Sequence, residues 1–167
     1  MNIPQKIIST LLLFSLNIAY GQVINKAECQ KVLIQAFVDS PYIFGKWTQD
    51  GQTETHLIYL GKVMTKSGNT FRLINSSYFW GLSHRATSTI LIFNSKNQYI
   101  GCYYLSSISD LPTGLKNGNL IFDNRRNDCD STLTTIVNLK KGLPRQFFRK
   151  CKDKFGDLYR FERVYQD

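Results

Sequence analysis

The sequence predicts an α+β fold that is mostly antiparallel β, with one N-terminal helix packed on a curved sheet or barrel of about eight strands. One segment has helical periodicity, and the rest of the chain consists of short β-rich runs separated by turn residues. A single helix cannot supply the crossover connections that a parallel sheet requires. A two-sheet sandwich is the alternative arrangement of the same strands.

The first residues are typical of a secretory signal. Lys6 precedes an apolar stretch over residues 7–18, and small residues lie three and one positions before a cut at Gln22. The stretch has roughly 12 residues, whereas a membrane-spanning helix needs roughly 20. We therefore expect a cleaved signal peptide over residues 1–21. The single β-rich domain over residues 22–167 is then secreted or periplasmic and has no transmembrane anchor.

The helix is expected over residues 25–39. Asn25 can cap its first turn, and Glu28 stands three residues later at the position of a capping box. Pro41 ends the helix, because the residue before a proline avoids the helical conformation. Five residues share the expected apolar face: Cys29, Val32, Leu33, Ala36 and Phe37.

The strands follow Pro41 at close spacing, which favours antiparallel meanders. Residues 66–69 are typical of a hairpin turn, and residues 87–93 are apolar enough for a strand that is covered on both faces. The predicted strands are residues 56–65, 70–80, 87–93, 98–106, 119–122, 132–139, 146–151 and 158–164.

The four cysteines all follow the predicted cut, and an even number in an exported domain favours disulfides. We expect a Cys129–Cys151 bridge, which closes a short loop between neighbouring strands. We also expect a Cys29–Cys102 bridge, which ties the helix to a central strand. Since no two cysteines have the close spacing of zinc ligands, no metal site and no cofactor are expected.

Positive charge is concentrated near the C-terminus. The chain has a formal net charge of +9, and residues 140–167 contain nine Lys or Arg against four acids. Such a surface attracts anions, so the expected partner is an anionic envelope polymer or another protein, and no nucleic acid is expected. The alternative is a solvated basic face without a partner. The candidate binding residues here are Arg149, Lys150, Lys152 and Lys154.

A second group of candidates is aromatic. Residues 78–85 lie between two predicted strands and contain Trp80, His84 and Arg85, which could stack on a ring and bind an anionic group. The alternative is that this segment closes one end of the core. Tyr99 and Tyr103 are expected on one face of a strand, where they either pack or line a ligand cavity.

One short motif resembles a known family. Gly45-Lys46-Trp47 is similar to the Gly-x-Trp that opens the first strand of lipocalins. That resemblance implies a secreted eight-stranded barrel that carries a small apolar ligand.

Three functional hypotheses follow. The leading one is an exported, non-catalytic binding or structural domain of a bacterial envelope, because no catalytic residue can be nominated. The second is the lipocalin-like carrier. The third is a small envelope hydrolase, which requires His56 or His84 to lie in a cleft within hydrogen-bond reach of a Ser, Asp or Glu. A catalytic elbow at Ser83 is not favoured, because Arg85 replaces its second glycine.

Overall fold

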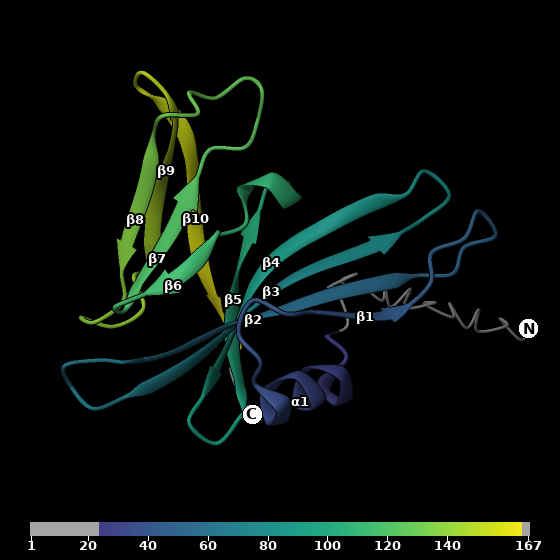
Figure 1. Ribbon diagram of the computed structural model, residues 1–167, viewed down its shortest axis with the longest axis horizontal. Helices are drawn as coiled ribbons and strands as arrows, with labels where there is room; N and C mark the ends of the chain where they lie inside the picture. Colours follow the sequence, from purple (N-terminus) through teal and green to yellow (C-terminus); the bar gives the residue numbers. More distant parts are fainter. Residues whose placement is uncertain (1–23, 165–167) are drawn as a thin grey trace, which may run out of the picture.

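The computed structural model describes residues 24–164, so the predicted signal peptide and the cut at Gln22 lie outside the described residues. The described chain folds as one α-helix, one 3₁₀ helix and ten strands (Figure 1). The elements are α1 (Lys26–Gln35), β1 (Pro41–Gly45), β2 (Glu54–Met64), β3 (Thr70–Trp80), β4 (Arg85–Asn94), β5 (Tyr99–Leu105), η1 (Ile108–Asp110), β6 (Gly114–Lys116), β7 (Asn119–Asp123), β8 (Thr134–Asn138), β9 (Gln146–Lys152) and β10 (Phe155–Arg163).

The strands form two antiparallel sheets. Seven strands pair in the order β1-β2-β3-β4-β5-β10-β9, and β6, β7 and β8 form the smaller sheet. The larger sheet has β1 at one edge and β9 at the other. The predicted class, mostly antiparallel β with one N-terminal helix on a curved sheet, is therefore confirmed.

The larger sheet has a hydrophobic core on each face. On one face, Cys29, Val32 and Leu33 of α1 pack with residues that include Leu57 and Ile74. On the other face, side chains of the larger sheet pack with the smaller sheet and the β9–β10 hairpin. Every residue from position 89 to position 93 is buried, as expected for a strand that is covered on both sides.

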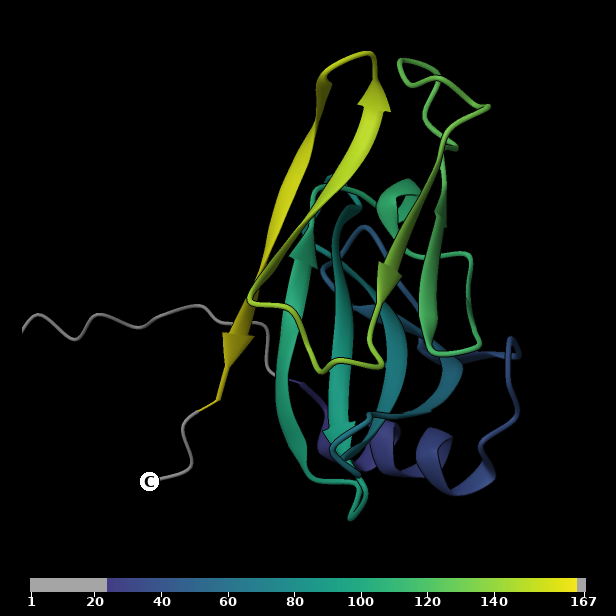
Figure 2. The same ribbon diagram turned by 90° about the vertical axis from the view of Figure 1, so that its left-hand side faces the viewer.

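The β9–β10 hairpin extends the larger sheet over the smaller one. Residues 161–163 of β10 pair with β5, whereas residues 155–160 pair with β9. Figure 2 shows the hairpin in yellow, rising beyond the end of β5. Along the hairpin, Phe147 and Tyr159 are buried on one face, whereas Phe148 and Leu158 are exposed on the other.

The helix is shorter than predicted. Asn25 caps it as expected, since its side chain accepts hydrogen bonds from the N–H groups of Ala27 and Glu28 at 3.1 and 3.3 Å. The helix ends at Gln35, because Ala36 takes the left-handed conformation at φ 52° and its N–H donates to Val32. Phe37 consequently lies outside the helix and is exposed.

Two strands, β1 and β6, were not predicted from the sequence. β6 has only three residues, and its pairing with β7 defines it. β1 begins at a proline on an edge of the sheet, a position that proline tolerates. Gly45 is the last residue of β1 and Trp47 follows the strand, so the lipocalin-like motif does not open this strand. A Cβ on Gly45 would lie 2.4 Å from the Thr53 carbonyl oxygen, which explains the glycine.

One of the two predicted disulfides is confirmed. Cys129 and Cys151 are bonded, with their Cα atoms 4.5 Å apart. The predicted Cys29–Cys102 bridge is wrong: both are free, buried thiols in the core between α1 and the sheet. There they serve as small apolar packing residues. None of the helices in the described chain has the length and apolar character to cross a membrane.

Candidate functional site

The outward face of the β9–β10 hairpin combines cations with apolar side chains. Phe148 pairs with Leu158 and Lys150 pairs with Gly156, and cross-strand partners share a face of the sheet. Phe148 and Leu158 are 43% and 49% exposed. We use the name basic hairpin face for the exposed residues of this outward face and its turn, together with the exposed Arg145 and Arg163 at the base of the hairpin: Arg145, Phe148, Lys150, Lys152, Lys154, Phe155, Leu158, Arg160 and Arg163.

Three arginines of the basic hairpin face line a groove of about 520 Å³. Arg145 precedes β9, while Arg160 and Arg163 lie on β10. The Phe161 N–H donates to the Arg145 carbonyl at 2.9 Å, which holds the segment before β9 against β10. Within residues 24–164, none of these arginines forms an ion pair with a carboxylate. The groove therefore presents positive charge that the described residues do not neutralise.

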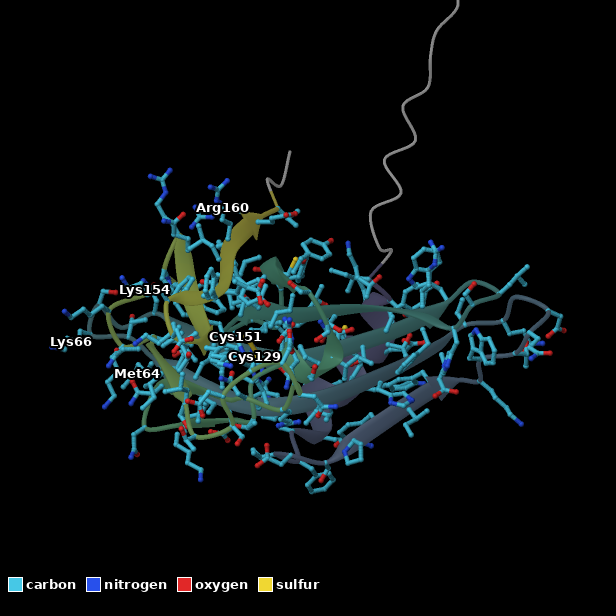
Figure 3. The ribbon with its side chains drawn as sticks, turned by 90° about the horizontal axis from the view of Figure 1, so that it is seen from above. Met64, Lys66, Cys129, Cys151, Lys154 and Arg160 are labelled. Carbon is cyan, nitrogen blue, oxygen red and sulfur yellow. A yellow bond between two sulfur atoms is a disulfide. The ribbon has the colours of Figure 1, made fainter. Side chains whose placement is uncertain are left out.

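The predicted lysines are exposed, whereas the predicted Arg149 is not. Lys150, Lys152 and Lys154 lie on the hairpin, and Figure 3 shows Lys154 and Arg160 on its strands and turn. Because side chains alternate along β9, Arg149 lies on its inner face, where its side chain is 0% exposed. It is held inside the protein and does not contribute to the basic hairpin face.

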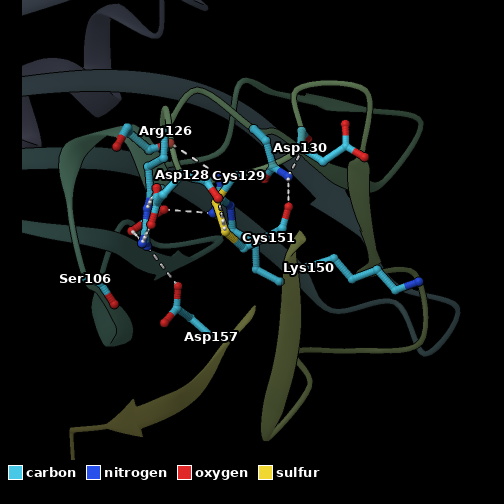
Figure 4. The surroundings of a disulfide bond; sticks show 12 residues. Ser106, Arg126, Asp128, Cys129, Asp130, Lys150, Cys151 and Asp157 are labelled. Carbon is cyan, nitrogen blue, oxygen red and sulfur yellow. Dashed lines mark hydrogen bonds and ion pairs between the residues drawn. A yellow bond between two sulfur atoms is a disulfide. The ribbon is translucent and has the colours of Figure 1, made fainter. Parts of the chain in front are cut away.

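Arg149 belongs to a charged network that also contains Arg126, Asp128 and Asp157, which Figure 4 shows beside the disulfide. Its guanidinium donates to Asp110 at 2.7 Å, and Asp110 also accepts a hydrogen bond from the Ser107 hydroxyl at 2.9 Å. Arg126 lies 3.7 Å from Asp110 and donates to Asp128 and Asp157. The network ties η1 to β9 and to the loop that carries Cys129.

The side chains of Trp80, His84 and Arg85 make separate contacts in the structure. The Trp80 indole N–H donates to the Thr87 hydroxyl at 3.0 Å, and the Arg85 guanidinium lies 5.8 Å from the centre of the Trp80 ring. His84 packs instead against the rings of Trp47 and Phe79, with centroid distances of 4.2 and 4.9 Å. The three residues therefore do not form one binding group.

The two tyrosines lie on opposite faces of the sheet, so the prediction that they share one face is wrong. The pairing register between β4 and β5 shifts next to Gly101, so that the side chains of β5 before and after this point alternate out of step. Tyr99 packs on Phe93 in the core beside α1. Tyr103 is fully buried in the other core, and its hydroxyl donates to the Pro144 carbonyl at 2.7 Å. Burial raises the pKa of both phenols.

A second hollow lies between the larger sheet and the segment that follows β5. It has a volume of about 300 Å³, and we call it the polar cleft. The sheet supplies three polar side chains to it, His56 of β2 and Asn75 and Ser77 of β3. The charged residues Asp39 and Arg125 also line it. Asn75 and Ser77 were not predicted as site residues, although two polar residues on one face of an apolar strand are a detectable signal.

His56 is held by a carboxylate at the polar cleft. Its Nε2 contacts a carboxylate oxygen of Glu54, and the other Glu54 oxygen accepts from the Trp47 N–H at 3.1 Å. The hydrogen bond from His56 is the main reason that the pKa of Glu54 is lowered. His56 thus meets the geometric condition of the hydrolase hypothesis. No hydrogen bond in the described structure joins either histidine to a serine.

The acidic residues near Cys129 each have partners of their own. Asp123 accepts from the hydroxyls of Thr113 and Thr134 at 2.8 and 2.9 Å, and Asp130 accepts from Thr132. Asp128 lies close enough to Cys129 and Cys151 to suggest a metal cluster, but the two sulfurs are bonded to each other. These side chains stabilise local turns.

No known protein-family model, no curated protein and no solved structure matches the chain.

Proposed function

We propose that this chain is an exported, non-catalytic binding domain whose basic hairpin face contacts the phosphate-bearing headgroups of an anionic envelope lipid. The observation that carries this proposal is the groove lined by Arg145, Arg160 and Arg163, in which the guanidinium groups have no carboxylate partner among the described residues. Arginine suits phosphate because its planar fork donates two parallel hydrogen bonds.

The apolar side chains beside the cations favour a lipid over a soluble anionic polymer. Phe148 and Leu158 lie on the same face as Lys150, and Phe155 is exposed at the adjacent turn. A surface that binds at a lipid interface combines cations, which attract anionic headgroups, with exposed apolar groups, which enter the headgroup region. A purely polar polymer would leave these apolar groups in water.

Two features of the chain support its export. Cys129 and Cys151 form a disulfide, a bond that persists mainly in oxidising compartments. The pattern of residues 1–21 is also typical of a cleaved signal. Together they favour the periplasm or the extracellular space, where envelope lipids are accessible.

The test is sedimentation of the protein with vesicles of phosphatidylglycerol and phosphatidylcholine, compared with vesicles of phosphatidylcholine alone. The variant R145Q/R160Q/R163Q removes the groove cations, and each cation near an anionic surface contributes about 1 kcal/mol. We expect binding to the anionic vesicles to weaken about a hundredfold in this variant, and to weaken with added salt in the wild type.

The matched control is K46Q/K62Q/K96Q, which removes the same charge from exposed positions outside the basic hairpin face. It should reduce binding only slightly. Equal losses in the two variants would mean that net charge alone causes the binding, which contradicts a built site. Stronger binding to soluble polyphosphate than to vesicles would contradict the choice of a lipid.

A further inference from the structure

We propose that the polar cleft is a second binding site, independent of the basic hairpin face, and that it takes a single hydroxyl-rich unit such as one sugar of a glycan. Its volume of about 300 Å³ is at the lower end of the range for small-ligand pockets. It combines the two features such pockets share, a few converging polar groups and an apolar wall.

The first support is an acceptor that the protein leaves without a donor. Asn75 is 5% exposed, and its amide nitrogen donates to the Pro112 carbonyl at 2.9 Å. That bond orients the amide, and its oxygen then has no hydrogen-bond partner in the described structure. A buried acceptor without a donor costs about 1–3 kcal/mol of stability. Asn75 lines the polar cleft but its oxygen has almost no accessible surface, so a ligand hydroxyl supplies the missing donor once the amide turns toward the cleft.

The second support is the arrangement of polar groups around Asn75. Ser77 lies two residues along the same strand face, and His56 is its cross-strand partner. The Glu54 carboxylate holds the imidazole of His56 in place through Nε2. A hydroxyl-rich ligand, whose groups both donate and accept, can bond to a carbonyl oxygen, a hydroxyl and an imidazole at once.

The third support is the opposite wall, where the apolar Ile108 and Leu111 lie beside Thr113. Ile58 of the sheet also lines the cleft with Ile108 and Leu111, and such side chains suit the C–H face of a sugar ring. The buried ion pair between Asp110 and Arg149 fixes this wall next to Ile108. Fixed walls reduce the entropy lost when a ligand binds.

The test is an NMR titration of the intact secreted domain with glucose, N-acetylglucosamine and galacturonate. We expect saturable shifts for at least one sugar at the Asn75 side-chain amide and at Ser77 and Thr113. The variant Ile108→Trp fills the cleft from an exposed position and should weaken binding at least tenfold. Ser77→Ala removes one hydrogen bond and should weaken it about fivefold.

The matched control is Ile34→Trp on α1, an exposed position that does not line the cleft. It should leave sugar binding unchanged. The proposal is overturned if none of the three sugars gives saturable shifts at these residues, or if Ile108→Trp binds as tightly as the wild type. Vesicle binding by the basic hairpin face is measured separately, so the two proposals fail independently.

Discussion

At the scale of single residues, Arg149 shows how burial decides what a charged side chain does. Its neighbour Lys150 has the same charge but lies on the other face of β9, in solvent. Arg149 enters the core only because Asp110 neutralises it, since an unpaired buried charge is expensive. Its role is to hold η1 against the hairpin.

The first residue prediction concerns this ion pair. Asp110→Asn leaves the Arg149 charge buried without its partner, and we expect it to lower the free energy of unfolding by about 3–5 kcal/mol. Urea denaturation measures this difference. The exposed control Lys150→Met should change stability by less than about 0.5 kcal/mol. Equal effects of the two substitutions would contradict the structural role assigned to Arg149.

The second residue prediction concerns the free cysteines. Burial raises the pKa of Cys29 to about 12, with a smaller contribution from Glu28, and burial also raises the pKa of Cys102. Both thiols should therefore be protonated and unreactive toward Ellman's reagent in the folded protein at neutral pH. After unfolding in urea without reductant, two thiols per chain should react. No reactive thiol in urea would indicate that these cysteines are bridged after all.

At the scale of elements, the β9–β10 hairpin is tied to the rest of the fold at both ends. Residues 161–163 of β10 join β5 at one end. The Cys129–Cys151 disulfide joins β9 to the loop after β7 at the other end. This anchoring keeps the basic hairpin face in a fixed position relative to the sheet, which a binding surface requires.

The element prediction follows from the disulfide. The bond joins residues 22 positions apart. Removing it increases the conformational entropy of the unfolded chain, which lowers the free energy of unfolding by about 3 kcal/mol in the loop-entropy description. We expect Cys129→Ala/Cys151→Ala to lose about that much stability in urea denaturation. Reductant should destabilise the wild type but not this variant. A loss below about 1 kcal/mol would mean that the hairpin is held mainly by packing.

At the scale of the whole molecule, carboxylates that accept hydrogen bonds give the fold a dependence on pH. Glu54 accepts from His56 and from the Trp47 N–H, and Asp123 accepts from two threonine hydroxyls. Each bond favours the ionised form and lowers the pKa in the folded state. The carboxyl groups with a lowered pKa are Asp50, Glu54, Asp123, Asp128 and Asp130.

The whole-molecule prediction is loss of stability in acid. A lowered folded pKa contributes stability that is present above the ordinary values, 4.5 for Glu and 3.8 for Asp, and that is lost as pH falls through the folded value. Burial raises the pKa of Glu28, which acts in the opposite direction, but it is one group against five. The Tm should therefore fall between pH 5 and about pH 3. Asp123→Asn should show a smaller fall, and a constant Tm would contradict this balance.

Local patterns predicted much of the fold because each depends on neighbours in the chain. Asn25 caps α1, the turn after Thr65 joins β2 to β3, and Cys129 and Cys151 lie at the ends of a short loop. Strand alternation and turn residues likewise predicted antiparallel pairing. The lysines of the basic hairpin face were predicted for the same reason, since they are close in sequence, whereas Arg160 and Arg163 of its groove were not nominated.

The tertiary structure alone decided what depends on contacts between distant residues. A shifted ladder beside Gly101 placed Tyr99 and Tyr103 on opposite faces, and packing left Cys29 and Cys102 unbonded. The polar cleft brings Asn75 within reach of Pro112, which is 37 positions away in the chain. Sequence periodicity reports which residues are inward or outward along one strand. Which inward residues meet is set by how the sheets pack.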